Sequence, residues 1–378
     1  MGKILSSISC NLDENILSAA LPLFKAEKIE AIEWSFDTLF KLSNIPDWFT
    51  ELLTTFGNKK RLIGHGVYFS LFSGGWTDAQ HAWLQHLEKV SAFVQFDHIS
   101  EHFGFMTGSD FHQGAPLPIP FTHVTMAIGR DRLKRISQSC KCPVGLENLA
   151  FAFSPEDVAK QGEFLDQLLE PVNGFIILDL HNLYCQAHNF GISLNDLLRF
   201  YPLNRVREIH ISGGSWENSQ THPGKKIRRD THDDTVPEEV FHLLISTIPQ
   251  CPNLKFLVME QLGNGLDTEY KQILFRQDFA KMKDIAKIAN SRAPQYFQKN
   301  EFRSTLAETF DQPLEDSLLK TQQTELSNIL ETASTYEHAV NLLQSSSLSN
   351  TGWETEKWEP FMVETAIAIA QKWKNGFA

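Results

Sequence analysis

Short apolar runs rich in Val, Ile and Leu recur along the first 260 residues and alternate with amphipathic stretches. Runs of this length and composition are typical of buried strands. Eight are present, at residues 3–9, 31–36, 61–67, 93–99, 142–148, 175–181, 206–212 and 255–261. The stretches between them, such as 16–28, 76–93, 154–170 and 236–250, carry apolar residues at helical spacing. Because parallel strands need a crossover helix between them, this alternation predicts an α/β fold, a (β/α)8 TIM barrel.

A doubly wound open sheet is the competing architecture. It would normally carry a glycine-rich phosphate loop after its first strand. The segment after the first predicted strand here, "ISCNLDENI", contains no glycine. The barrel is therefore the favoured prediction.

Two connections, residues 103–130 and 213–237, are longer than the others, and both follow strands. In a TIM barrel such loops lie on the face where active sites are built. We expect them to cover a pocket. The second holds a basic cluster, and a solvated loop and a docking patch for an acidic partner are equally good interpretations of it. The cluster consists of Lys225, Lys226, Arg228 and Arg229.

The character of the chain changes near residue 290, where strand signals end and helical spacing continues to the C-terminus. We predict a barrel domain over residues 1–289 and a helical C-terminal extension over 290–378. The extension is either a fused module that binds a partner or part of a substrate, or a set of helices packed on the bottom of the barrel. The second is our expectation, because amphipathic helices usually just pack.

Composition limits the possible functions. Hydrophobic residues make up 42% of the chain and charged residues 21%, as in a folded domain. The formal net charge of −12 argues against a general nucleic-acid-binding protein, because such a surface repels phosphates. No apolar run approaches the roughly 18–20 residues that span a bilayer, the opening residues are too polar for a secretory signal, and the five scattered cysteines do not resemble a disulfide framework. We expect a cytoplasmic protein without a membrane or nucleic-acid partner.

Polar residues gather where the predicted strands end. In a closed barrel these ends converge on one mouth, so residues far apart in sequence become neighbours. The candidates, in chain order, are His65, Asp97, His98, Glu101, His102, Glu147, Asn148, Asp179, His181, His210 and Glu260, with Asp230 and His232 from the long loop. His98 and Glu101 stay undecided.

A concentration of histidines and carboxylates at one mouth predicts a metal site, because buried charges need partners. Each residue alone is weak evidence, since a lone His or Asp at a strand end is more often a hydrogen-bonded structural group. Mixed His, Asp and Glu ligands without Cys suit iron, manganese or zinc, and carboxylates that can bridge favour more than one ion. We predict supporting positions for Asn148 and Asn182, and for His188 either a supporting or a purely structural role.

Seven segments together resemble the multinuclear non-heme iron-dependent oxidative enzymes (the MNIO family), which include the methanobactin-forming oxidase. They are "GHGVYFSL", "SEHFGF", "APLPIPFT", "GLENLA", "LDLHNLYCQAHNFG", "REIHISGG" and "DTHDDTVPEEVF", within roughly residues 1–285. The resemblance implies a xylose-isomerase-like barrel that holds two or three irons in mixed Fe(II)/Fe(III) states and uses O2 as co-substrate. It also implies a ribosomally made precursor peptide as substrate, modified at cysteine during natural-product maturation, often with a separate leader-binding partner protein.

Carried over by residue, the resemblance assigns His65, His102 and Glu147 to one iron. Glu147 would bridge to a second iron held by Asp179, His210 and Glu260. A third metal would use Asp230 and His232, with a residue of the Asp-Leu-His-Asn stretch such as His181. This chain departs from the family pattern at two places. The resemblance leads us to expect Asn where this chain has His181, and a His within 212–215, where this chain has Ser-Gly-Gly-Ser. No side chain beyond the metal ligands is implied as the main acid or base.

Two other functions use the same ligand types. One is a divalent-metal sugar isomerase or epimerase, or a phosphodiesterase, on a similar barrel, since fold alone does not set function. Acidic charge disfavours the phosphodiesterase, and no Lys stands beside Glu147 as an isomerase would have it. The other is a non-catalytic metal-binding protein, which would normally have a small closed site.

Overall fold

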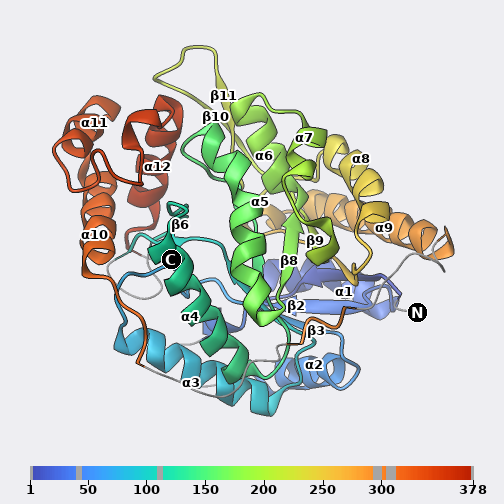
Figure 1. Ribbon diagram of the computed structural model, residues 1–378. Helices are drawn as coiled ribbons and strands as arrows, with labels where there is room; N and C mark the ends of the chain where they lie inside the picture. The colour runs from blue at the N-terminus through green and yellow to red at the C-terminus, as the bar shows by residue number, and fades with distance from the viewer. Residues whose placement is uncertain (1–2, 40–44, 109–113, 293–299, 304–311, 376–378) are drawn as a thin grey trace.

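The computed structural model describes residues 3–39, 45–108, 114–292, 300–303 and 312–375, and its centre is a closed barrel of eight parallel strands (Figure 1). Around the barrel the order is β1-β12-β9-β8-β7-β4-β3-β2. The predicted (β/α)8 fold is thereby confirmed. The strands are β1 (Leu5–Ser9), β2 (Ala31–Trp34), β3 (Leu62–His65), β4 (Ile99–His102), β7 (Val144–Glu147), β8 (Phe175–Asp179), β9 (Val206–Ile211) and β12 (Phe256–Met259).

Helices surround the barrel and begin at residues suited to capping. Thr77, Thr122 and Ser154 each accept a hydrogen bond from a backbone N–H of the first turn, which satisfies a donor that would otherwise lack a partner. These helices are α1 (Glu14–Lys25), α2 (Asp47–Gly57), α3 (Asp78–Phe93), α4 (His123–Cys140), α5 (Pro155–Leu169), α6 (Leu180–Phe190), α7 (Leu194–Arg199), α8 (Glu238–Thr247) and α9 (Glu269–Arg292).

The fourth strand begins six residues later than predicted. Residues 93–99 were expected to form it, but Phe93 ends α3 with its ring 61% exposed, and β4 begins at Ile99. Asp97 and His98 consequently precede β4, at the end of the barrel opposite the mouth. An apolar run that joins a helix end to a strand start looks like one strand in the sequence.

Both long connections carry short antiparallel strand pairs. β5 (Phe105–Met106) pairs with β6 (Pro116–Leu117), and β10 (Trp216–Asn218) pairs with β11 (Lys226–Arg228). The first connection is shorter than predicted because α4 already begins at His123. Its residues 109–113 lie outside the described part of the chain. The second forms a hairpin beside α6 (Figure 1).

The C-terminal helices pack against loops at the mouth, so the expectation that they lie on the barrel bottom is wrong. They are α10 (Ser317–Thr332), α11 (Tyr336–Gln344) and α12 (Pro360–Trp373). Gln323 of α10 donates to Phe72 O (2.7 Å) in the loop after β3. Trp358 stacks on Phe153 in the loop after β7, with ring centroids 3.7 Å apart. Amphipathicity predicts that a helix packs, but the complementary surface decides where.

Glu364 of α12 ties these helices to the hairpin. Its carboxylate accepts hydrogen bonds from the backbone N–H groups of Gln220 and Thr221 (2.7 and 3.2 Å) and from the hydroxyls of Ser219 and Thr221 (both 3.0 Å). Four donors aimed at one carboxylate hold the turn between β10 and β11 in place.

Replacing Glu364 with alanine is expected to loosen this turn. Hydrogen bonds to a charged group contribute about 1.5–3 kcal/mol each, so the Gln220 and Thr221 amides should exchange with solvent at least roughly tenfold faster. Hydrogen–deuterium exchange measures this directly, with Glu337→Ala on the exposed side of α11 as the control. Unchanged exchange in the hairpin would contradict the anchoring role.

The bottom of the barrel is closed by residues 300–303. Phe302 is fully buried and packs edge-to-face on Phe175 inside the barrel, with centroids 5.9 Å apart. Asn300 exchanges hydrogen bonds with Asn173 at the start of β8 (3.1 and 3.2 Å). The division at residues 289 and 290 stays a prediction, and α9 runs through it to Arg292.

None of the helices in the described ranges combines the length and the apolarity needed to cross a bilayer.

Candidate metal centre

Side chains from six strand ends or loops meet at the mouth in two groups with ligand atoms within 4.8 Å of one another. One group is His65, His102 and Glu147, and the other is Glu147, Asp179, His210 and Glu260. The register explains the meeting, because His102 pairs with Glu147 and Asp179 pairs with His210 on neighbouring strands. Glu147 belongs to both groups.

The two oxygens of Glu147 face different groups. Oε2 lies 3.3 Å from His65 Nε2 and 3.5 Å from His102 Nε2, whereas Oε1 lies 3.4 Å from His210 Nδ1. His210 Nδ1 is also 3.2 Å from Glu260 Oε2. Ligands held at about 2.0–2.2 Å from one ion lie about 3 Å or more apart, so these spacings suit coordination. Glu147 could therefore bridge two ions, with one oxygen toward each group.

Neighbouring groups set the tautomers of two histidines. The Ser100 hydroxyl donates to Gly64 O (3.3 Å), so it accepts from His65 Nδ1 (2.9 Å) and leaves Nε2 of His65 as the lone-pair nitrogen. His210 Nε2 lies 2.9 Å from Glu208 Oε1, which leaves Nδ1 as its lone-pair nitrogen. In both residues the nitrogen left free faces Glu147. Partners of this kind orient metal-binding histidines.

Asp179 is held by its position at a helix start. Asp179 is the N-cap of α6, and its Oδ1 accepts a hydrogen bond from Asn182 N (2.6 Å). This cap does not use Oδ2, which stays available as a ligand atom. Asn148 accepts from Asp179 N (2.7 Å) and donates to Asp179 O (3.2 Å), and Asn182 donates to Asn148 O (2.7 Å). Asn148 and Asn182 thus form a support around this carboxylate.

The electrostatics of the two groups suit a cation. Asp179 Oδ2 and His210 Nδ1 are buried and have no hydrogen-bond partner among the described residues. Burial, with Asp230 and Glu147 nearby, holds the pKa of Asp179 well above its usual range. Orphaned buried acceptors and crowded carboxylates are stabilised by a metal ion, so the residues present fit one or more divalent ions.

The third predicted set is arranged differently. His181 lies in the first turn of α6, not in β8, and its Nδ1 is 2.9 Å from Asp230 Oδ1. The same oxygen lies 2.9 Å from His232 Nε2, and Arg228 Nε donates to His181 Nε2 (3.1 Å). Among the described residues, Asp230 and His232 belong to no set of three or more ligand atoms that all lie within 4.8 Å of one another.

Arg228 is a residue whose position the sequence did not reveal. It is 4% exposed, so it belongs neither to a solvated loop nor to a surface docking patch. Alternation along β11 would not have found it, because Lys226 is exposed whereas Ile227 and Arg228 are both buried. His188 lies outside the metal groups and packs on Tyr184 and Trp216, with centroids 4.4 and 5.0 Å away.

A buried polar column continues below His210. His98 Nε2 lies 2.6 Å from Glu208 Oε2, and His98 Nδ1 lies 3.0 Å from Asp97 Oδ1, which pairs with Arg207 (2.6 Å). His98 and Asp97 therefore belong to the support below the centre. Glu208, which the sequence reasoning missed, points into the barrel because it alternates with Ile209 in β9.

Glu33, Glu208 and His210 also bring ligand atoms close together. A neutral imidazole has a single lone-pair nitrogen, and Nδ1 of His210 already faces Glu147 and Glu260. Burial raises the pKa of Glu33, which disfavours its charged form in the absence of a cation. Glu208 is the hydrogen-bond partner of His210 Nε2, and Glu33 Oε2 lies 3.2 Å from the same nitrogen.

Glu101 lies outside the centre, although it stands next to His102. It is fully buried against Gly66, and burial followed by the charge of Asp37 holds its pKa well above the usual range. Residues 100 and 102 point into the barrel, so residue 101 points outward.

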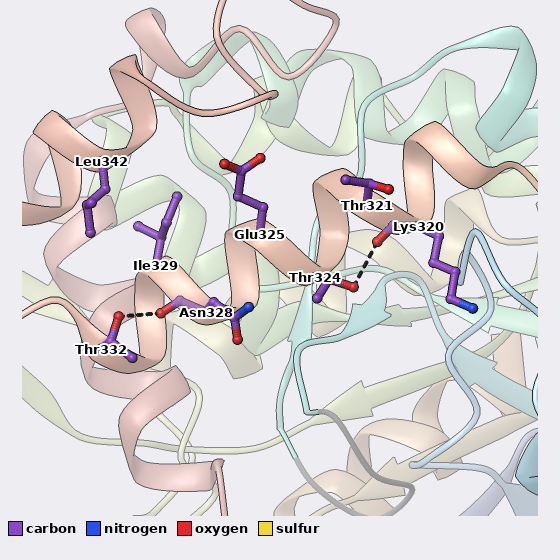
Figure 2. Close-up of a pocket in the computed structure, with 8 residues that line it drawn as sticks. All are labelled: Lys320, Thr321, Thr324, Glu325, Asn328, Ile329, Thr332 and Leu342. Carbon is purple, nitrogen blue, oxygen red and sulfur yellow. Dashed lines mark hydrogen bonds between the residues drawn. The ribbon is translucent and has the colours of Figure 1, made fainter.

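A separate depression of about 540 Å3 on the outside of α10 is lined by seven residues of α10 and by Leu342 of α11 (Figure 2). None of its lining residues belongs to the groups at the mouth.

Comparison with known proteins identifies the family. Residues 41–263, more than half of the chain, match the family described as "RiPP precursor modification enzyme MbnB/TglH/ChrH". The chain belongs to this family. RiPP precursors are ribosomally made peptides, and all nine candidate metal ligands lie inside the matched residues. The C-terminal helices lie outside them.

Individual relatives of the MbnB/TglH/ChrH family carry names that state no activity. A UPF0276 protein of Caulobacter vibrioides is 27% identical over 180 residues, 47% of this chain and 61% of that protein. A UPF0276 protein of Pasteurella multocida is 26% identical over 252 residues, 61% of this chain and 78% of that protein. The chain spans about three fifths of the length of the first of these relatives.

Solved structures are similar to this chain at low sequence identity. An L-ribulose 3-epimerase has a TM-score of 0.49 and 12% identity, over 77% of this chain and 97% of that chain. Endonuclease IV from Thermus thermophilus has a TM-score of 0.48 and 13% identity, over 74% of this chain and 99% of that chain. At these values neither similarity bears on the chemistry of this member of the MbnB/TglH/ChrH family.

Proposed function

We propose that this protein is a multinuclear iron-dependent, O2-using oxidase that modifies a cysteine of a ribosomally synthesised precursor peptide during natural-product maturation. The family supplies the class of substrate. The observation that carries the proposal is Glu147, whose two oxygens face two separate ligand groups. A bridged pair of ions suits multi-electron chemistry better than a single structural ion does.

In this proposal His65, His102 and Glu147 hold the first iron. Glu147, Asp179, His210 and Glu260 hold the second. When bound, adjacent irons supply electrons for the reduction of O2 and an open position for a substrate thiolate. Ser100 and Glu208 orient the imidazoles of His65 and His210. The proposal assigns no side chain beyond the metal ligands as the main acid or base.

Access to the centre supports a peptide substrate. The side chains of His102, His232 and Asp230 are 24%, 20% and 24% exposed, whereas those of His65 and His210 are 4% and 0% exposed. The centre is therefore reached from the side of His102 and the loop that carries Asp230. A peptide side chain entering there meets the proposed first iron.

The C-terminal helices stand beside this entrance, because they pack on the loops after β3 and β7 and on the hairpin. We propose that residues 290–378 are an appended unit whose helices α10 and α12 border the path of the precursor. A separate leader-binding partner stays a prediction. We also propose a cytoplasmic site of action, where ribosomal precursors arise and where five unpaired thiols persist.

The test combines metal analysis with a reaction. Protein loaded with Fe(II) without oxygen is mixed with a cysteine-containing precursor peptide encoded beside its gene, and O2 is then admitted. We expect O2 consumption and a mass change on a cysteine-containing fragment, both absent with metal-free protein. An intact peptide, or function with manganese, magnesium or zinc alone, would favour an isomerase, epimerase or hydrolase instead.

A further inference from the structure

We infer that the centre holds two metal ions and that Arg228 closes the third predicted position, where Asp230, His232 and His181 meet. This rests on the proposed function only in taking the first two ligand groups as occupied. It concerns Asp230, His232 and His181, which belong to neither of those two groups. Four observations carry it.

The hydrogen bond from Arg228 decides the tautomer of His181. A guanidinium only donates, so His181 Nε2, 3.1 Å from Arg228 Nε, must accept. The proton of the neutral ring is then on Nδ1, which donates to Asp230 Oδ1 (2.9 Å). Neither nitrogen of His181 has a lone pair left for a metal.

Spacing separates this set from the two groups beside it. The ligand atoms of those groups lie within 4.8 Å of one another, and no group that includes Asp230 or His232 meets that limit within the described part of the chain. Two ligands on opposite sides of one ion are only about 4–4.4 Å apart, given metal–ligand distances of about 2.0–2.2 Å. Asp230 Oδ1 and His232 Nε2 lie 2.9 Å apart, as two ligands of one ion could, but in the described residues no third ligand atom completes a set with them.

The two glycines of the segment after β9 leave no room for a ligand side chain. A Cβ at Gly214 would lie 2.2 Å from Arg229 O and 3.1 Å from His181 Cε1. A Cβ at Gly213 would lie 2.0 Å from Thr235 O. The backbone of the long loop fills the space beside both glycines.

Arg228 is built into position. Asn189 of α6 accepts from Arg228 N (2.8 Å) and donates to Arg228 O (3.1 Å), which fixes its backbone. Its guanidinium lies over the rings of Tyr184 and Trp216, 5.3 and 5.2 Å from their centroids. An arginine is always charged in proteins, so Arg228 places a positive charge next to His181, on the side of the ring opposite Asp230.

The test counts metal in full-length protein and in matched variants. Each protein is loaded with excess Fe(II) without oxygen and desalted, and iron per chain is measured together with the Mössbauer spectrum. We expect two irons in the wild type, in Asp230→Asn, in His232→Gln and in the control Asp234→Asn, an exposed residue of the same loop. Asp179→Asn and Glu260→Gln should hold one iron or fewer. Circular dichroism checks that each variant is folded.

Three irons in the wild type that fall to two in Asp230→Asn or His232→Gln would overturn the inference while leaving the proposed oxidase standing. If the wild type and both variants hold two irons but no precursor is oxidised, the inference is supported and the proposed function is refuted. A folded wild type that holds no iron would refute both.

Discussion

Glu147→Gln is expected to remove metal from both groups at once, because the two oxygens of this side chain face separate sets of ligands. An amide presents one oxygen and one NH2 group, so it does not bridge two cations. Even changes to residues that merely support metal ligands lower affinity roughly 10–100-fold, and a shared ligand should exceed that. We expect less than one iron per chain and no detectable peptide oxidation.

Thermal unfolding gives a second measurement of the same change. Metal at 100 times its dissociation constant stabilises the protein that binds it by about 2.7 kcal/mol, and the Glu147→Gln protein should lack this metal-dependent shift. Glu88→Gln, an exposed residue on α3, is the control and should behave as the wild type. A variant that retains two irons would contradict the bridging role of Glu147.

Trp358→Ala is expected to destabilise the protein by about 3–5 kcal/mol, as does truncation of other large buried aromatic residues. Trp358 is 8% exposed, stacks on Phe153 and donates from its indole nitrogen to Trp353 O (2.9 Å). Its loss opens a cavity between the C-terminal helices and the loop after β7. Urea unfolding measures the effect.

The matched control is Trp48→Ala. Trp48 is 51% exposed near the start of α2, so its removal should change the free energy of unfolding by only about 0.5 kcal/mol. If both variants unfold at the wild-type midpoint, Trp358 does not anchor the C-terminal helices to the barrel.

The sequence by itself determined the barrel and most of the positions around its mouth. Strand and helix periodicities are local, and the C-terminal ends of parallel strands converge wherever a barrel closes. His65, Glu147, Asp179, His210 and Glu260 could therefore be predicted to meet before any side chain was placed. The start of β4 was misjudged because the end of α3 and the following apolar residues form one continuous signal.

Only the tertiary structure decided what surrounds those residues. The tautomer of His210 depends on Glu208, and that of His181 depends on Arg228, which comes from the far strand of a hairpin. The site where α12 packs depends on the turn that Glu364 binds. Hydrogen bonds and packing surfaces of this kind join segments separated by many residues, and they arise from three-dimensional complementarity that no local pattern encodes.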